Sequence, residues 1–109
     1  MRIESDWQGG CLHMSLSGEL DHHCAESTLS ELELTADRFM PRSVSLDLSG
    51  LSFMDSSGIA VILRLSKRMQ QTDGRIWVED PSPQVRRVLA ASGVGRIVPI
   101  RYTERRAAK

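Results

Sequence analysis

The stretch that decides the fold covers residues 44–58, which read Val-Ser-Leu-Asp-Leu-Ser-Gly-Leu-Ser-Phe-Met-Asp-Ser-Ser-Gly. Its first part alternates apolar and polar side chains, which is typical of a strand with one buried face. The polar pair at 49–50 then predicts a short turn. From Ile59 the apolar residues recur at helical spacing, so a helix is expected to begin close to Ser57. Ser56 should therefore lie at the surface, where a strand ends and a helix begins, and open α/β sheets meet ligands and partners at such points.

The rest of the chain predicts a single α/β domain. Helical connections imply parallel neighbouring strands, yet the strands alternate apolar and polar residues, which indicates that only one sheet face is covered. A chain of 109 residues suits one domain, with a mixed β-sheet and helices mainly on one face. The predicted elements are strands at 3–7 and 12–16, a helix that follows residue 21 with its apolar stripe from 25 to 39, a strand at 44–48, a helix at 57–71, a strand at 75–79, a helix at 83–92 and a short strand at 97–100.

Several residues are expected to mark the ends of these elements. The Ser-Gly pair at 17–18 should end the second strand, and Asp21 should cap the helix that follows, with two histidines in its first turn. Arg68 is expected to face water from the second helix. Residues 103–109 have no apolar face and are expected to form a loose tail.

The charges are balanced overall but divided along the chain. Residues 1–55 hold ten acidic and three basic side chains, whereas residues 56–109 hold eleven basic and four acidic ones. The simpler interpretation is that complementary surfaces meet within one fold. The more specific interpretation is that an acidic face of the protein steers a basic partner toward it. The basic half has no interleaved aromatic residues, which favours a solvated face over nucleic-acid binding.

The cysteines and the apolar runs indicate a protein of the cytoplasm. Cys11 and Cys24 make neither a disulfide framework nor a Cys-x-x-Cys motif, so both are expected to be ordinary thiols in a reducing compartment. No apolar run approaches the roughly 18 residues of a membrane span. The amino terminus has no apolar stretch after its single Arg, so no signal peptide is expected.

The pattern alone leaves two interpretations of Ser56. A serine at a helix start can be a simple cap. A cap needs one oxygen, however, and here two serines precede Gly58, which costs about 1 kcal/mol against alanine inside a helix. Small residues would leave an open surface that another protein could approach. The free N–H groups and the dipole of the helix start could also stabilise a phosphate on Ser56.

Catalysis, metals and cofactors receive little support. Ser56 is not in a Gly-x-Ser-x-Gly elbow, so a small serine hydrolase is only an alternative, which reaction with an active-serine probe would reveal. Adjacent histidines such as His22 and His23 point about 100° apart on a helix, which is poor geometry for one metal. No glycine-rich loop is present to hold the phosphates of a cofactor.

Two motifs carry a resemblance to a known family. Residues 53–58, Phe-Met-Asp-Ser-Ser-Gly, followed by an Ile-Ala-Val-Ile-Leu helix, resemble the signature of the anti-sigma factor antagonists of the STAS domain family. Residues 18–23, Gly-Glu-Leu-Asp-His-His, resemble a segment of the sporulation branch of that family, which controls sigma factor F. The resemblance covers nearly the whole chain and is weakest after Arg101. It implies a single STAS domain over residues 1–109.

The resemblance also implies a mechanism. The unphosphorylated protein would bind an anti-sigma factor, which is also a serine kinase, and so release a sigma factor. That kinase would phosphorylate the first serine of the Asp-Ser-Ser-Gly motif, Ser56, and a separate phosphatase would reset it. Ser57 is the adjacent candidate, and the pattern alone does not separate the two.

The resemblance further implies where the partner binds. The free protein is expected to be a monomer without a cofactor. The alternative is a STAS module of another signalling or transporter assembly, against which the Gly-Glu-Leu-Asp-His-His segment speaks. The residues expected to meet the partner are Gly18, Glu19, Asp21, His22, His23, Asp55, Ser56, Ser57 and Gly58.

Overall fold

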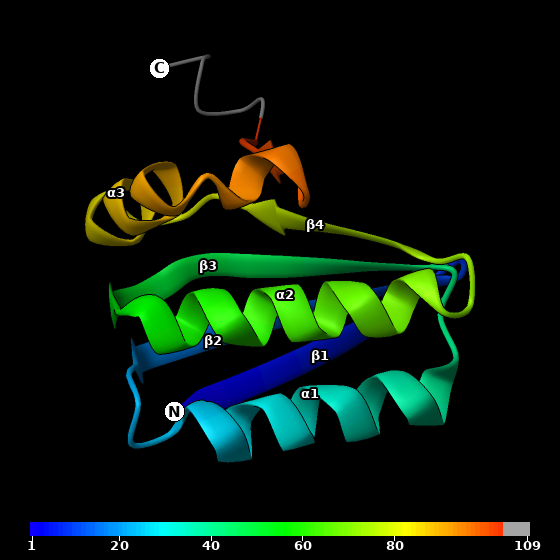
Figure 1. Cartoon of the computed structure of the whole chain (residues 1–109). Helices are drawn as coiled ribbons and strands as arrows, with labels where there is room; N and C mark the ends of the chain where they lie inside the picture. Colours follow the sequence, from blue (N-terminus) through cyan, green and yellow to red (C-terminus); the bar gives the residue numbers. More distant parts are fainter. Residues whose placement is uncertain (104–109) are drawn as a thin grey trace.

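The computed structural model describes residues 1–103, in which five strands form one sheet and three α-helices connect them (Figure 1). A single 3₁₀ turn, η1, lies between the last helix and the last strand. The elements are β1 (Arg2–Gln8), β2 (Cys11–Leu20), α1 (Ala25–Phe39), β3 (Ser43–Met54), α2 (Ser56–Gln70), β4 (Arg75–Glu79), α3 (Pro83–Ser92), η1 (Val94–Arg96) and β5 (Ile100–Arg101).

The sheet is mixed, as the sequence predicted. The strands lie in the order β1-β2-β3-β4-β5; β1 and β2 form an antiparallel hairpin, and every later neighbour is parallel. The crossover helices all connect neighbouring strands in the same direction along the sheet. Because such crossovers are right-handed, they bring their helices to the same face. Figure 1 shows α1 and α2 side by side in front of the sheet, so the expected arrangement is confirmed.

The core lies between the sheet and these helices. The alternation that predicted the strands decides which side chains are buried, because successive residues point to opposite faces. The residues between the buried ones belong to the opposite face; His13 and Asp47 are half-buried there, while Ser45 is buried. The buried apolar side chains of β2 and β3, each at most 2% exposed, are Leu12, Met14, Leu16, Leu20, Val44, Leu46, Leu48, Leu51 and Met54.

The predicted ends of two strands are wrong. The Ser-Gly pairs at 17–18 and 49–50 were expected to end strands, yet β2 continues to Leu20 and β3 to Met54. The extensions pair with each other in parallel, and the register shifts where they begin. A Cβ on Gly50 would lie 2.6 Å from the Ser17 hydroxyl, so the glycine permits a close approach of the strands. Pairing between distant strands thus overrides the local turn signal.

The last predicted strand is shorter than expected. Residues 94–96 form η1, and β5 consists of Ile100 and Arg101 only. Pro99 directly precedes this edge strand, as the sequence suggested. The amide of Thr103, the first residue of the expected loose tail, donates to the Asp80 carboxylate at 2.8 Å. The rest of that tail, residues 104–109, lies outside the described residues.

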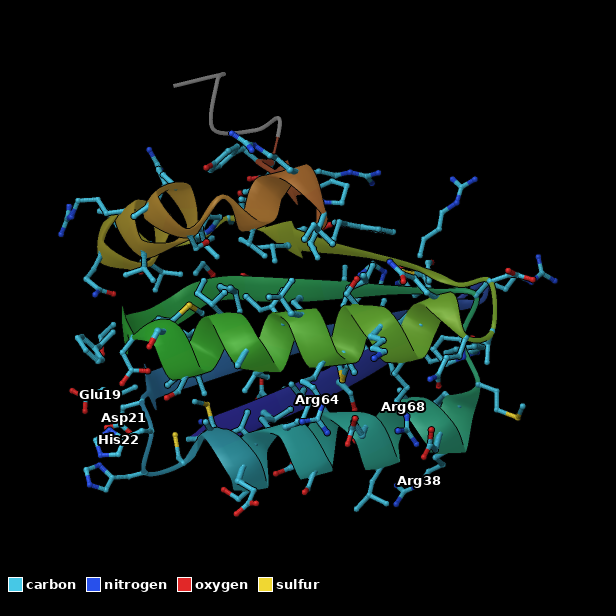
Figure 2. All side chains as sticks on the ribbon, viewed as in Figure 1. Glu19, Asp21, His22, Arg38, Arg64 and Arg68 are labelled. Carbon is cyan, nitrogen blue, oxygen red and sulfur yellow. The ribbon has the colours of Figure 1, made fainter. Side chains whose placement is uncertain are left out.

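An ion-pair cluster joins the two long helices. Arg68 of α2 was expected to face water, but its Nε donates to Asp37 of α1 at 3.0 Å and its Nη1 lies 3.4 Å from a Glu33 carboxylate oxygen (Figure 2). The hydrogen bond from Arg68 lowers the pKa of Asp37, and the same bond raises the pKa of Arg68. Part of the charge division along the chain is therefore complementarity within the fold.

Both tryptophans lie on strands that are not part of the β2–β3 junction. Trp7 of β1 stacks on Phe39 at the end of α1, with ring centroids 5.3 Å apart. Trp77 of β4 donates its indole N–H to Glu79 at 2.8 Å, and the Arg101 guanidinium lies 4.3 Å from its ring centroid. These contacts tie β1 to α1 and β4 to β5.

Candidate functional site

The unexpected extensions of β2 and β3 bring the two sequence motifs together. Glu19 pairs with Phe53, and Leu20 pairs with Met54, at the ends of the two parallel strands. The amide of Asp55 then donates to the carbonyl of Leu20 at 3.3 Å. Residues 18–23 and 53–58 therefore form one surface where α2 begins, and this surface is called the site below.

Asp55 caps α2. Its carboxylate accepts the Ser57 amide at 2.8 Å, and its carbonyl accepts the Gly58 amide at 3.0 Å. The simple cap interpretation of Ser56 is therefore wrong, because the neighbouring aspartate has that role. Ser56 is the first residue of α2 and is exposed, while Ser57 is half-buried. Within the part of the chain that the structure describes, the Ser56 hydroxyl has no hydrogen-bond partner.

Gly58 has a different role from the one expected. The sequence predicted that Gly58 would help to leave an open surface for a partner, but the residue is buried. A Cβ at this position would lie 2.4 Å from Cγ of Met54 and 3.0 Å from its sulfur. The glycine lets the first turn of α2 pack directly on the Met54 side chain. The residue is therefore required by internal packing.

The Asp-His-His segment forms a turn and not the start of a helix. The Asp21 carbonyl accepts the amides of Cys24 and Ala25 at 3.2 and 3.0 Å, and α1 begins only at Ala25. The predicted helix cap at Asp21 is wrong: its carboxylate accepts the amide of His23 at 2.9 Å within the turn. Because β2 continues to Leu20, the chain is still extended at that point. The helix therefore begins at Ala25, later than the predicted cap at Asp21 implied.

A histidine connects the two motifs. His22 Nδ1 lies 3.8 Å from a carboxylate oxygen of Asp55, and the rings of His22 and His23 are 4.0 Å apart between centroids.

Partial desolvation raises the pKa of Asp21, but the backbone hydrogen bonds from His23 and Cys24 outweigh it and hold that pKa below its ordinary value. Asp21 is therefore ionised at neutral pH.

The site is acidic and also exposes a phenyl ring. Glu19, Asp21 and His22 lie together beside the start of α2, while the labelled arginines lie farther along the helices (Figure 2). Phe53 is 38% exposed next to them. Sequence reasoning missed Phe53, although an apolar residue between the polar Ser52 and the buried Met54 was a usable signal. Charged side chains around an exposed aromatic ring are typical of a surface that binds another protein.

A serine–histidine contact and possible groups of metal ligands are the features that would indicate hydrolytic or metal chemistry in residues 1–103. Ser45 contacts His13, but Ser45 is 1% exposed, so a substrate could not reach its hydroxyl. The described residues bring together no group of three His, Cys, Asp or Glu side chains able to hold a metal ion. Among those residues, no helix is both long enough and apolar enough to cross a membrane.

Comparison with known proteins agrees with the geometry. The model of the STAS domain family matches residues 2–107. The anti-sigma F factor antagonist of Paenibacillus polymyxa is 39% identical over 100 residues, which cover 92% of this chain and 86% of that protein.

Two solved structures of the anti-sigma factor antagonist SpoIIAA are also similar. The unphosphorylated form superposes with a TM-score of 0.79 at 29% identity, covering 98% of this chain and 93% of that one. The phosphorylated form, from Bacillus, superposes with a TM-score of 0.70 at 28% identity, covering 98% of this chain and 96% of that one. The resemblance seen in the two motifs is confirmed, and the chain belongs to the STAS domain family.

Proposed function

We propose that this protein is an anti-sigma factor antagonist that binds its anti-sigma factor through the site. The observation that carries the proposal is the junction of β2 and β3, which joins the motifs at 18–23 and 53–58 into one acidic surface. The 39% identity to an anti-sigma F factor antagonist over most of both chains supports it. The free thiols of Cys11 and Cys24 suit the reducing cytoplasm as its compartment.

Phosphorylation of Ser56 by the anti-sigma factor would switch this binding off. The exposed hydroxyl at the start of α2 is open to a kinase, whereas Ser57 is half-buried and its amide is held by Asp55. A phosphate adds about −1.5 to −2 charge at neutral pH, and the helix start can stabilise it without unfolding. Beside the carboxylate of Asp55, that charge would repel an acidic or apolar partner surface. A phosphatase would restore the binding form.

The test is phosphoryl transfer followed by intact mass. Incubated with ATP and the anti-sigma F factor of Paenibacillus polymyxa, the protein is expected to gain one phosphate. Ser56→Ala should gain none, because the accepting hydroxyl is gone, while the matched Ser57→Ala variant should still gain one. A Ser56→Ala protein that is phosphorylated to the same extent would assign the reaction to another residue.

Asp21 is proposed to contact the partner directly. Asp21→Ala is expected to weaken the complex about tenfold, measured by calorimetry, because it removes a carboxylate that would pair with a basic or hydrogen-bonding group of the partner at that position. Its melting temperature should change little, since the carboxylate bonds only to neighbours in its own turn, His23 and Cys24. Glu26→Ala, which removes an exposed acid from the first turn of α1, is the matched control. A large drop in melting temperature for Asp21→Ala alone would instead make the residue a structural one.

A further inference from the structure

The end of β3 that leads into the site lacks a strand neighbour on one side. β3 pairs with β4 only from Ser43 to Asp47, although it continues to Met54. Beyond Asp47 the place of the missing strand is taken by the start of α3, which lies beside the end of β3 in Figure 1. The groups that replace the strand are therefore side chains of α3.

Gln84 of α3 hydrogen-bonds both backbone groups of Met54. The Met54 amide donates to Gln84 Oε1 at 2.9 Å, and Gln84 Nε2 donates to the Met54 carbonyl at 3.1 Å. A paired strand would offer the same donor and acceptor. Among uncharged side chains, a primary amide presents both groups in one plane. A second contact, from the hydroxyl of Ser82 directly before α3 to the Leu51 carbonyl at 2.6 Å, lies three residues earlier on β3.

Met54 is the residue through which β3 fixes the start of α2. On its other side it pairs with Leu20, and its side chain packs under Gly58. Asp55, the cap of α2, follows it directly. The position of Asp55 and Ser56 therefore depends on where the Met54 backbone is held. Gln84 supplies the contact from the α3 side, without itself belonging to the acidic surface.

We infer that Gln84 is a positioning residue for the site: it holds Met54 and thereby fixes the start of α2 in the orientation that the partner binds. The inference rests on the proposed function, because it concerns the surface through which the anti-sigma factor would bind. It also makes the site sensitive to α3, an element that neither sequence motif includes.

The experiment compares three full-length proteins: the wild type, Gln84→Met and Ser82→Ala. Methionine matches the length of glutamine but makes neither hydrogen bond, and Ser82→Ala removes the neighbouring α3–β3 bond as a control. Amide hydrogen exchange at residues 54–58 reports the local opening of the site. Calorimetric titration with the anti-sigma F factor of Paenibacillus polymyxa reports binding, and melting temperatures report global stability.

Gln84→Met is expected to speed exchange at 54–58 about tenfold, because the start of α2 opens more easily. Binding should weaken about tenfold for a separate reason, because the closed start of α2 would hold the orientation that the partner binds for only about a tenth of the time. Ser82→Ala should lower the melting temperature to a similar extent but leave binding unchanged. Wild-type affinity in Gln84→Met, or equal losses of affinity in both variants, would overturn the inference. If the wild type does not bind the anti-sigma factor, the proposed function with this partner fails. Amide exchange then tests the positioning role by itself. Faster exchange confined to Gln84→Met supports that role, and unchanged exchange overturns it.

Discussion

Protein phosphorylated on Ser56 is expected to bind its anti-sigma factor about a hundredfold more weakly than the unmodified protein, because a phosphate placed against an acidic or apolar patch of the partner costs several kcal/mol. The added charge would lie directly beside Asp55, on the surface that also carries Glu19 and Asp21. Ser56→Asp should weaken the complex in the same direction but by less, since a carboxylate carries one charge and a phosphate nearly two. Isothermal titration of the three forms measures the effect.

Charge added elsewhere should not have this effect. Ser30→Asp places the same carboxylate on an exposed position of α1, away from the first turn of α2, and is the matched control. Its affinity should stay within about twofold of the wild type. Equal affinities for unmodified and phosphorylated protein would show that the start of α2 is not the docking surface. Equal weakening by Ser30→Asp would show a general effect of net charge.

Gly58→Val is expected to destabilise the domain by about 3 kcal/mol, at the upper end of the usual cost of overpacking. The smallest possible side-chain atom at this position would already overlap Cγ of Met54. Met54 cannot move aside easily, because its side chain is fully buried and both of its backbone groups are hydrogen-bonded to Gln84. Urea denaturation followed by circular dichroism gives the free energy of unfolding.

The clash is tested by combining two variants. Ala60→Val changes an exposed residue of the same helix, and only the modest helix propensity of valine should lower its stability, by about 0.5 kcal/mol. In a Met54→Ala background, the further cost of Gly58→Val should fall well below its cost in the wild type, because the overlapping atoms are absent. Additive losses in the double variant would mean that the glycine is required for another reason.

The sequence predicts most of the fold because its strands and helices follow simple periodicities. The alternation at Val44, Leu46 and Leu48 gives both a strand and its buried face, and α2 begins and ends within one residue of its expected bounds. These features depend on neighbours along the chain. The family resemblance rests on two short motifs, and the fold and the comparisons bear it out.

The sequence predictions are wrong where contacts with residues distant in the chain determine the local structure. The Ser-Gly pairs at 17–18 and 49–50 have the composition of turns, but each lies in a strand because the other strand offers it hydrogen bonds. Asp21 has the composition of a cap, yet strand pairing through Leu20 delays the helix. Gln84 carries no local signal at all, since its partner Met54 lies 30 residues away. The assignment of Ser56 and its neighbours to partner binding stays a prediction.

The placement of the two tryptophans gives the molecule a pair of intrinsic optical reporters. The indole of Trp7 stacks on Phe39 at the far end of α1, and that of Trp77 is covered by Arg101 near the other sheet edge. Unfolding would separate both rings from these neighbours and change their emission. Neither ring belongs to the surface around Ser56, so docking there should leave their fluorescence almost constant. Emission spectra can therefore follow the integrity of the domain while a complex forms, without a label.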